Sequence, residues 1–171
     1  MMNEKLLTAL SNQVNAEYYS AYLYLAMSAC ADEMGLKGTS SWLFAQSQEE
    51  MAHGTRIYQY ILERGETPTF AAIDCPPVSY ESINEIFEAT LDHERKVTGL
   101  INDIASIAMK ESDHACYQFL MWFVNEQVEE EASASDILSK LKLVGDNSGM
   151  LLDLDNDLGS RVFTNPFPEN Q

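Results

Sequence analysis

The placement of proline constrains the fold of this chain most, because proline interrupts helices. The chain has 171 residues and five prolines, and every proline lies in one central segment or near the C-terminus: Pro68, Pro76, Pro77, Pro166 and Pro168. The long stretches between them are rich in Glu, Leu, Ala, Gln and Met, which favour helices. Glycines and capping residues divide these stretches into four long helices. The predicted helices run from Glu4 to Asp32, from Thr39 or Ser40 to about Gly65, from a cap at Ser79 to about Lys110, and from Ser112 or Asp113 to just before Gly145.

The lengths of the connections predict how these helices are arranged. The first and third connections are short, so the helices that each one joins should be antiparallel. The middle connection, from Gly65 to Ser79, is much longer. Fully extended it could span up to ~50 Å, whereas a helix of about 26 residues is ~39 Å long. The expected fold is therefore all-α: a four-helix bundle with one long crossover between helices two and three, which is the ferritin-like topology.

A shorter amphipathic segment, over about 150–160, predicts a fifth C-terminal helix after a break at Gly149. Its apolar face consists of Leu151, Leu152, Leu154 and Leu158. The bundle leaves this face little to cover, so we expect it to be buried at a junction between subunits. A satellite helix packed on its own subunit is the alternative. Residues 1–171 are expected to form a single domain, with the bundle over about 4–143 and an irregular tail over 161–171.

Charge and cysteine content exclude several classes of function. The formal net charge is −17, from 27 acidic and 10 basic residues. Such a chain repels nucleic acid and anionic membranes and attracts metal cations. Its three cysteines, Cys30, Cys75 and Cys116, form no Cys-x-x-Cys pair, which excludes zinc fingers and thioredoxin chemistry and suits a reducing compartment. No apolar block suggests a signal peptide or a membrane helix, so we expect a cytoplasmic location.

Each long helix carries an acidic residue in its apolar stripe, close to its midpoint. These polar positions are Glu17, Glu50 with His53, Glu94, and Gln127 with Glu130. Mid-height is the level at which all four helices of a bundle meet, so the acids should converge. Burial without counter-charge would cost roughly several kcal/mol per carboxylate, and no Lys or Arg lies beside them on the stripes. Either the acids are protonated or a pair of divalent metal ions is bound, and the mixed oxygen and imidazole donors suit iron, manganese or zinc better than calcium.

At these residues the chain resembles the prokaryotic non-haem ferritins. The resemblance extends over the whole chain and rests on Glu17 with Tyr24, on Gln48 to His53, on His93 and Glu94, on Glu126 to Glu131, and on the short fifth helix. It implies iron storage with ferroxidase activity. Fe(II) would be oxidised to Fe(III) by dioxygen or peroxide at a di-iron centre within each subunit. The product would be stored as ferric oxide-hydroxide inside a hollow homo-oligomeric cage of 24 subunits.

The resemblance also implies a role for each matching residue. The first iron site would use Glu17, Glu50 and His53, and the second would use Glu50 as a bridge with Glu94 and Glu130. A third site maps to Glu49, Glu126 and Glu129. Gln127 would order water or oxygen beside the centre. Tyr24 could give up an electron during turnover, although a core tyrosine with a satisfied hydroxyl fits the sequence equally well. Trp122 has the same two interpretations, redox activity or ordinary packing.

Related families fit the sequence less well. Bacterioferritins carry a second Glu-x-x-His on helix four, where this chain has Gln127 and Glu130. Met51 falls where they place a haem-ligating methionine, but it also suits a subunit contact, and we expect no haem. Rubrerythrins need Cys-x-x-Cys pairs, and a Dps-type cage would not use a site inside one bundle. A metal-free structural bundle remains the rival from another class. His93 and His114 are expected to be surface residues, and the sequence indicates no reductant protein for iron release.

Overall fold

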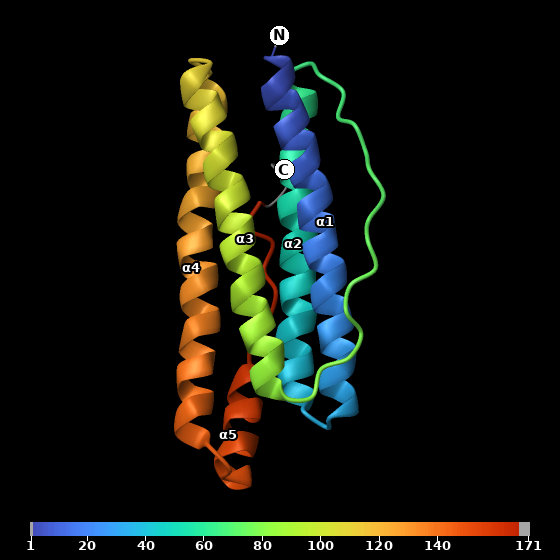
Figure 1. Ribbon diagram of the computed structural model, residues 1–171, viewed down its shortest axis with the longest axis vertical. Helices are drawn as coiled ribbons and strands as arrows, with labels where there is room; N and C mark the ends of the chain where they lie inside the picture. The colour runs from blue at the N-terminus through green and yellow to red at the C-terminus, as the bar shows by residue number, and fades with distance from the viewer. Residues whose placement is uncertain (1, 168–171) are drawn as a thin grey trace.

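The computed structural model describes residues 2–167, which form five helices and, within that range, no strand. The helices are α1 (Glu4–Glu33), α2 (Lys37–Glu63), α3 (Ile83–Lys110), α4 (His114–Val144) and α5 (Ser148–Leu158). The first four stand side by side, with α1 packed most extensively on α2 and α3 on α4 (Figure 1). The segment between α2 and α3 runs along the full length of the bundle outside α1 (Figure 1). The predicted all-α, ferritin-like bundle with one long crossover is therefore confirmed.

Capping side chains define where most helices begin. Asp113 was one of the two caps predicted for α4, and its carboxylate accepts a hydrogen bond from Cys116 N at 3.0 Å. The predicted cap at Ser79 is wrong, because Ser82 caps α3 instead. The Ser82 hydroxyl accepts from Glu85 N at 3.2 Å while the Glu85 carboxylate accepts from Glu81 N at 2.5 Å. The bond to Ser82 satisfies a donor in the first turn of the helix, and the bond from Glu81 ties the residue before the cap to the helix.

Two further boundaries differ from the sequence prediction. Helix α2 begins at Lys37 and not at Thr39 or Ser40, because a carboxylate from α5 supplies the cap that its own residues do not. The break before α5 falls at Gly145, whose φ of +53° favours glycine, and not at Gly149. The Asn147 side chain accepts hydrogen bonds from the backbone of Gly149 and Met150, so the helix includes both residues.

The apolar core is divided in two by a polar layer at mid-height. One cluster surrounds Leu10, Ile61 and Leu120, and the other surrounds Met27, Leu43 and Phe87. Between them along the four helices, the buried residues include a set of polar and charged side chains: Glu17, Glu50, His53, Glu94, Gln127 and Glu130. The two apolar clusters shield this layer from solvent along the bundle axis.

Helix α5 packs on its own subunit, against α2 and α4. Leu154 and Leu158 are buried in the same cluster as Trp42 and Leu43, whereas Leu152 stays 60% exposed. For Leu154 and Leu158 the alternative prediction is therefore right, because both pack on their own subunit. Only the exposed part of the helix is left for a junction between subunits. Among the residues that the structure describes, no helix has both the length and the apolar character to cross a membrane.

One buried carboxylate fixes where α5 lies. Asp155 accepts hydrogen bonds from Gly38 N at 2.9 Å, from Thr39 N at 2.7 Å and from the Thr39 hydroxyl at 2.7 Å. A Cβ at position 38 would lie 1.6 Å from the Asp155 carbonyl oxygen, so only glycine allows this close approach. The anchor sets the direction in which the chain continues after α5. Of the irregular tail predicted over 161–171, residues 168–171 lie outside the described part.

Candidate metal centre

The polar layer collects one or more side chains from each long helix. Glu17 comes from α1, Glu50 and His53 from α2, Glu94 from α3, and Gln127 and Glu130 from α4. Each side chain is buried, with at most 6% of its residue surface exposed. The structure thus brings together the residues that the sequence places at mid-height.

Glu17, Glu50 and His53 form the tightest group. Each offers one potential ligand atom, and these atoms lie within 4.8 Å of one another. His53 Nδ1 lies 3.4 Å from Glu50 Oε2. Glu17 Oε1 accepts a hydrogen bond from Gln13 Nε2 at 2.8 Å. Two buried atoms in this group, Glu17 Oε2 and His53 Nε2, have no hydrogen-bond partner. Buried polar atoms are rarely left unpaired, so these two atoms fit a position that binds a cation or a water molecule.

Close contact between α1 and α2 keeps this group compact. A Cβ at Gly54 would lie 2.8 Å from the Tyr18 ring and 3.2 Å from Glu17 Cβ. Glycine at this position therefore lets α2 approach the Tyr18 and Glu17 side chains of α1 closely at the height of the carboxylates.

The remaining acids are held by amide and hydroxyl donors. Gln46 Nε2 donates to Glu50 at 3.0 Å and to Glu130 at 2.9 Å. Gln127 Nε2 donates to Glu94 at 3.1 Å, and the Tyr24 hydroxyl donates to the other Glu94 oxygen. Gln46 was missed by the sequence analysis, although it lies four residues before Glu50 on the same face of the helix.

The pKa shifts of the polar layer indicate that its buried carboxylates cannot all carry a negative charge without a compensating positive charge. Burial, and then the charge of Glu50, raise the pKa of Glu17 and of Glu130 well above the usual range for a carboxyl, and raise the pKa of Glu94 to about 8. Burial alone would lower the pKa of His53, but the hydrogen bond and charge of Glu50 raise it to about 10. Burial would raise the pKa of Glu50, but the hydrogen bond and the charge of His53 outweigh burial and lower it. Without metal, protons supply the compensating charge.

These residues fit a divalent cation. Several carboxylates and one imidazole are the donors that iron, manganese and zinc accept. The orphaned atoms Glu17 Oε2 and His53 Nε2 are free to coordinate. Their assignment as ligands stays a prediction.

The residues expected to form a third site are placed differently from one another. Glu49 and Glu126 offer ligand atoms within 4.8 Å of each other and of His53, whereas Glu129 is exposed on α4 and lies outside this group. Burial raises the pKa of Glu126, and the charge of Glu49 adds to the rise. Glu49 already has a cationic partner, because its carboxylate forms an ion pair with Arg161.

Other residues singled out from the sequence lie around the centre. The Trp122 ring stands edge-on to His53 with centroids 5.4 Å apart, and Met51 is 50% exposed on α2. The surface prediction is right for His114 but wrong for His93, which is half-buried and shares a hydrogen bond of 2.7 Å with the Ser20 hydroxyl. His93 lies inside because it fills the space between α3 and the tyrosines of α1. Its ring centroid is 5.9 Å from that of Tyr24.

The fold and this site define the class of protein, a four-helix bundle with a buried cluster of carboxylates and one histidine that could hold a metal ion. The ferritin-like domain family model matches residues 7–144. The chain is 38% identical over 160 residues to a probable bacterial non-heme ferritin-like protein of Haemophilus influenzae, covering 94% of this chain and 97% of the relative. It is 40% identical over 163 residues to a bacterial non-heme ferritin of Staphylococcus saprophyticus, covering 95% and 98%.

A solved structure gives the same result. The open pore ferritin of the hyperthermophilic archaeon Archaeoglobus fulgidus superposes with a TM-score of 0.93 at 45% identity, covering 95% of this chain and 99% of that one. The chain belongs to the ferritin-like domain family, among the prokaryotic non-haem ferritins. This membership supports iron storage as its function.

Proposed function

We propose that this chain oxidises Fe(II) to Fe(III) at the polar layer and stores the product. The observation that carries the proposal is the convergence of Glu17, Glu50, His53, Glu94 and Glu130 from four helices, with two buried ligand atoms left unpaired. A metal-free bundle has no reason to keep these acids buried, because removing their charge from water is costly.

The chemistry follows from charge. Two Fe(II) ions enter as substrate, one at Glu17, Glu50 and His53 and one at Glu50, Glu94 and Glu130. Each gives one electron, and dioxygen or peroxide accepts the pair. The anionic donors stabilise Fe(III) more than Fe(II), so they favour the oxidised product. Binding releases protons, because His53 and Glu94 must lose theirs before they can coordinate.

Neighbouring residues orient this site. Gln46 holds Glu50 and Glu130 through its amide, and Gln127 and Tyr24 hold the two oxygens of Glu94. Gln127 also has a position from which it could order water or oxygen. The hydrogen bond of the Tyr24 hydroxyl to Glu94 supports the proposal that Tyr24 gives up an electron during turnover.

We further propose that the subunits assemble into a hollow 24-subunit shell that holds ferric oxide-hydroxide, in the cytoplasm. The similarity to the open pore ferritin supports the assembly. The net charge of −17 suits attraction of Fe(II) and nucleation of the mineral.

Oxidation kinetics test the proposal. Metal-free protein is mixed with Fe(II) in air, and formation of Fe(III) is followed by absorbance. Glu50→Ala and His53→Ala should each slow the reaction by at least about tenfold, because loss of even an outer-shell partner of a ligand costs about 10- to 100-fold at metal sites. Glu63→Ala is the matched control, because Glu63 is exposed on the same helix and should leave the rate unchanged. Equal rates in all four proteins would contradict a ferroxidase centre at these residues.

A further inference from the structure

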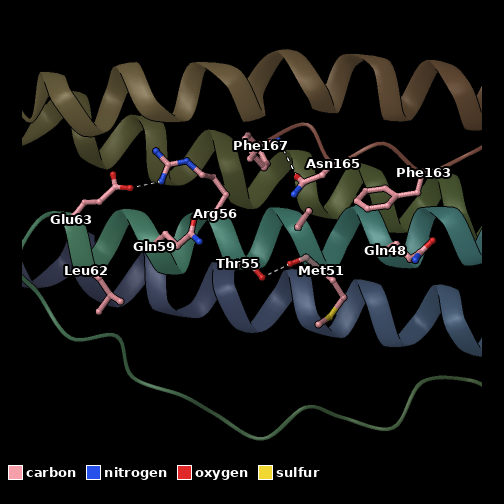
Figure 2. Close-up of a pocket in the computed structure, with 11 residues that line it drawn as sticks. Gln48, Met51, Thr55, Arg56, Gln59, Leu62, Glu63, Phe163, Asn165 and Phe167 are labelled. Atoms are coloured by element: carbon pink, nitrogen blue, oxygen red, sulfur yellow. Dashed lines mark hydrogen bonds and ion pairs between the residues drawn. The ribbon is translucent and has the colours of Figure 1, made fainter. Parts of the chain in front are cut away.

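The chain after α5 returns along the bundle to the metal centre. It leaves the α5 end and runs beside α2 in the same direction as that helix, to about mid-height (Figure 1). Phe163, Asn165 and Phe167 lie above α2 in this order and line a groove of about 1070 Å³ with it (Figure 2). The Phe167 ring packs on Trp122, with centroids 4.4 Å apart, and stands edge-on to His53 at 6.2 Å. The tail therefore covers the α2 and α4 side of the centre.

Arg161 ties this tail to the bundle. Its guanidinium forms an ion pair with Glu49, donates to the side-chain oxygen Oε1 of Gln46 at 2.6 Å, and lies 4.4 Å from the centroid of the Trp42 ring. Only 25% of the Arg161 side chain and 17% of the Glu49 side chain are exposed. Partial burial strengthens such a charge-assisted contact compared with one on the open surface.

The contact places a positive charge where a cation could otherwise bind. Glu49 shares a possible cation position with Glu126 and His53, and Nε2 of His53 is buried without a partner. Within residues 2–167, the ion pair with Arg161 is the only one that Glu49 forms. The guanidinium occupies one oxygen of the Glu49 carboxylate, Oε2, and its positive charge repels a metal ion from this position.

The contact also reaches the proposed iron ligands. Gln46 receives the Arg161 hydrogen bond on its carbonyl oxygen and donates from its amide nitrogen to Glu50 and to Glu130. Arg161 thus fixes which end of the buried amide points inward. If Arg161 leaves, Gln46 loses the hydrogen bond that fixes it from outside.

We propose that Arg161 is an internal competitor for a third cation. With two metal ions bound, its guanidinium holds Glu49 and keeps the tail closed. A third divalent cation binds at Glu49 and Glu126 only by displacing Arg161, which frees the tail and releases Gln46. The inference rests on the proposed function, because it presumes that the first two positions bind metal.

Equilibrium binding of Zn(II) tests the competition without any redox reaction. Native protein should bind two Zn(II) per subunit tightly and a third weakly. In Arg161→Gln the third ion should bind about tenfold more tightly, since a charge-assisted competitor has been removed. The double variant Glu49→Gln/Arg161→Gln should lose this gain. Arg161→Lys keeps the charge and should stay close to the native value.

A matched control and a second readout accompany the titration. Arg56→Gln removes another partly buried arginine ion pair that involves α2, the one with Glu63, and should leave all Zn(II) affinities unchanged. Hydrogen exchange of residues 159–167 should accelerate in the native protein when the third ion binds, and not when only two are bound. In Arg161→Gln it should be fast before the third ion is added.

The outcomes separate the two proposals. If native protein binds no Zn(II) tightly, the proposed metal centre itself fails. If two ions bind tightly in every protein but the third binds equally in native protein and Arg161→Gln, only the competition is overturned. It is also overturned if the double variant Glu49→Gln/Arg161→Gln keeps the gain of Arg161→Gln, because Glu49 would then not be the ligand for which Arg161 competes.

Discussion

Raising the pH should destabilise the metal-free protein, because the polar layer holds protons that the unfolded chain releases. The pKa of Glu94 rises on folding from 4.5 to about 8. Between these values the folded state keeps a proton that the unfolded state has lost, so the contribution of Glu94 to stability is complete below pH 4.5 and is lost as the pH rises through 8. One proton corresponds to about 1.4 kcal/mol per pH unit, so Glu94 alone accounts for about 3 kcal/mol between pH 5.5 and 7.5.

The other groups of the layer do not reverse this sign. His93 beside the layer opposes it in part, because burial lowers the pKa of His93 and its contribution to stability therefore grows as the pH rises to 6.5. The pKa of His53 rises from 6.5 to about 10, so His53 adds a loss of stability above pH 6.5. Burial also raises the pKa values of Glu17 and Glu130. The pKa of Glu50 is lowered, so its contribution is lost only as the pH falls below its ordinary range. It is therefore constant across this window.

Calorimetry of metal-free protein at fixed ionic strength and protein concentration measures the effect. A loss of about 3 kcal/mol lowers the unfolding temperature of a domain of this size by about 6–12 °C. Saturating Zn(II) should abolish or reverse the slope, because metal binds the deprotonated donors more tightly as the pH rises. Glu94→Gln should reduce the slope by about one proton. An unfolding temperature that is flat or rises over this window without metal would refute the reasoning, and so would an unchanged slope in Glu94→Gln.

Two further predictions concern the anchor of α5 and the assembly. Asp155→Ala should lower the free energy of unfolding by about 3 kcal/mol, because the buried donors of Gly38 and Thr39 lose their acceptor. Asp157→Ala, at an exposed position of the same helix, should change it little. Denaturant titration measures both variants, and equal effects would contradict the anchoring role of Asp155. Light scattering should give a particle of several hundred kilodaltons, compared with a subunit mass of 19.2 kDa; a monomer would exclude the shell and leave only the metal centre.

The helices and their order could be predicted because residues close together in the sequence determine approximately where each helix begins and ends. Prolines and glycines mark the connections, and the length of the segment between Gly65 and Ser79 allows the crossover. Exact ends were harder where the partner is distant in sequence. The cap of α2 is the Asp155 carboxylate, more than a hundred residues away in the sequence. The residues around Lys37 give no indication of it.

The acids of the centre could be predicted for a similar reason, since a carboxylate in an apolar stripe stands out at helical spacing. The contacts of Arg161 could not be predicted, because the tail that contains Arg161 has no periodic structure and the position of this tail depends on α5. One signal was available: Arg161 is the only Lys or Arg after Lys142. In so acidic a chain, an isolated positive charge near the C-terminus favours a carboxylate partner. His93 was misplaced because its helix position alone does not reveal that the tyrosines of α1 cover it.

The central claim is that the buried acids of four helices bind divalent cations. Diffraction on either side of the iron absorption edge, from crystals soaked anaerobically in ferrous salt, tests it most directly. We expect two anomalous peaks in the polar layer, one beside Glu17 and His53 and one beside Glu94 and Glu130, with Glu50 between them. A map with no anomalous peak among these side chains would contradict the metal centre and, with it, the proposed oxidation of iron.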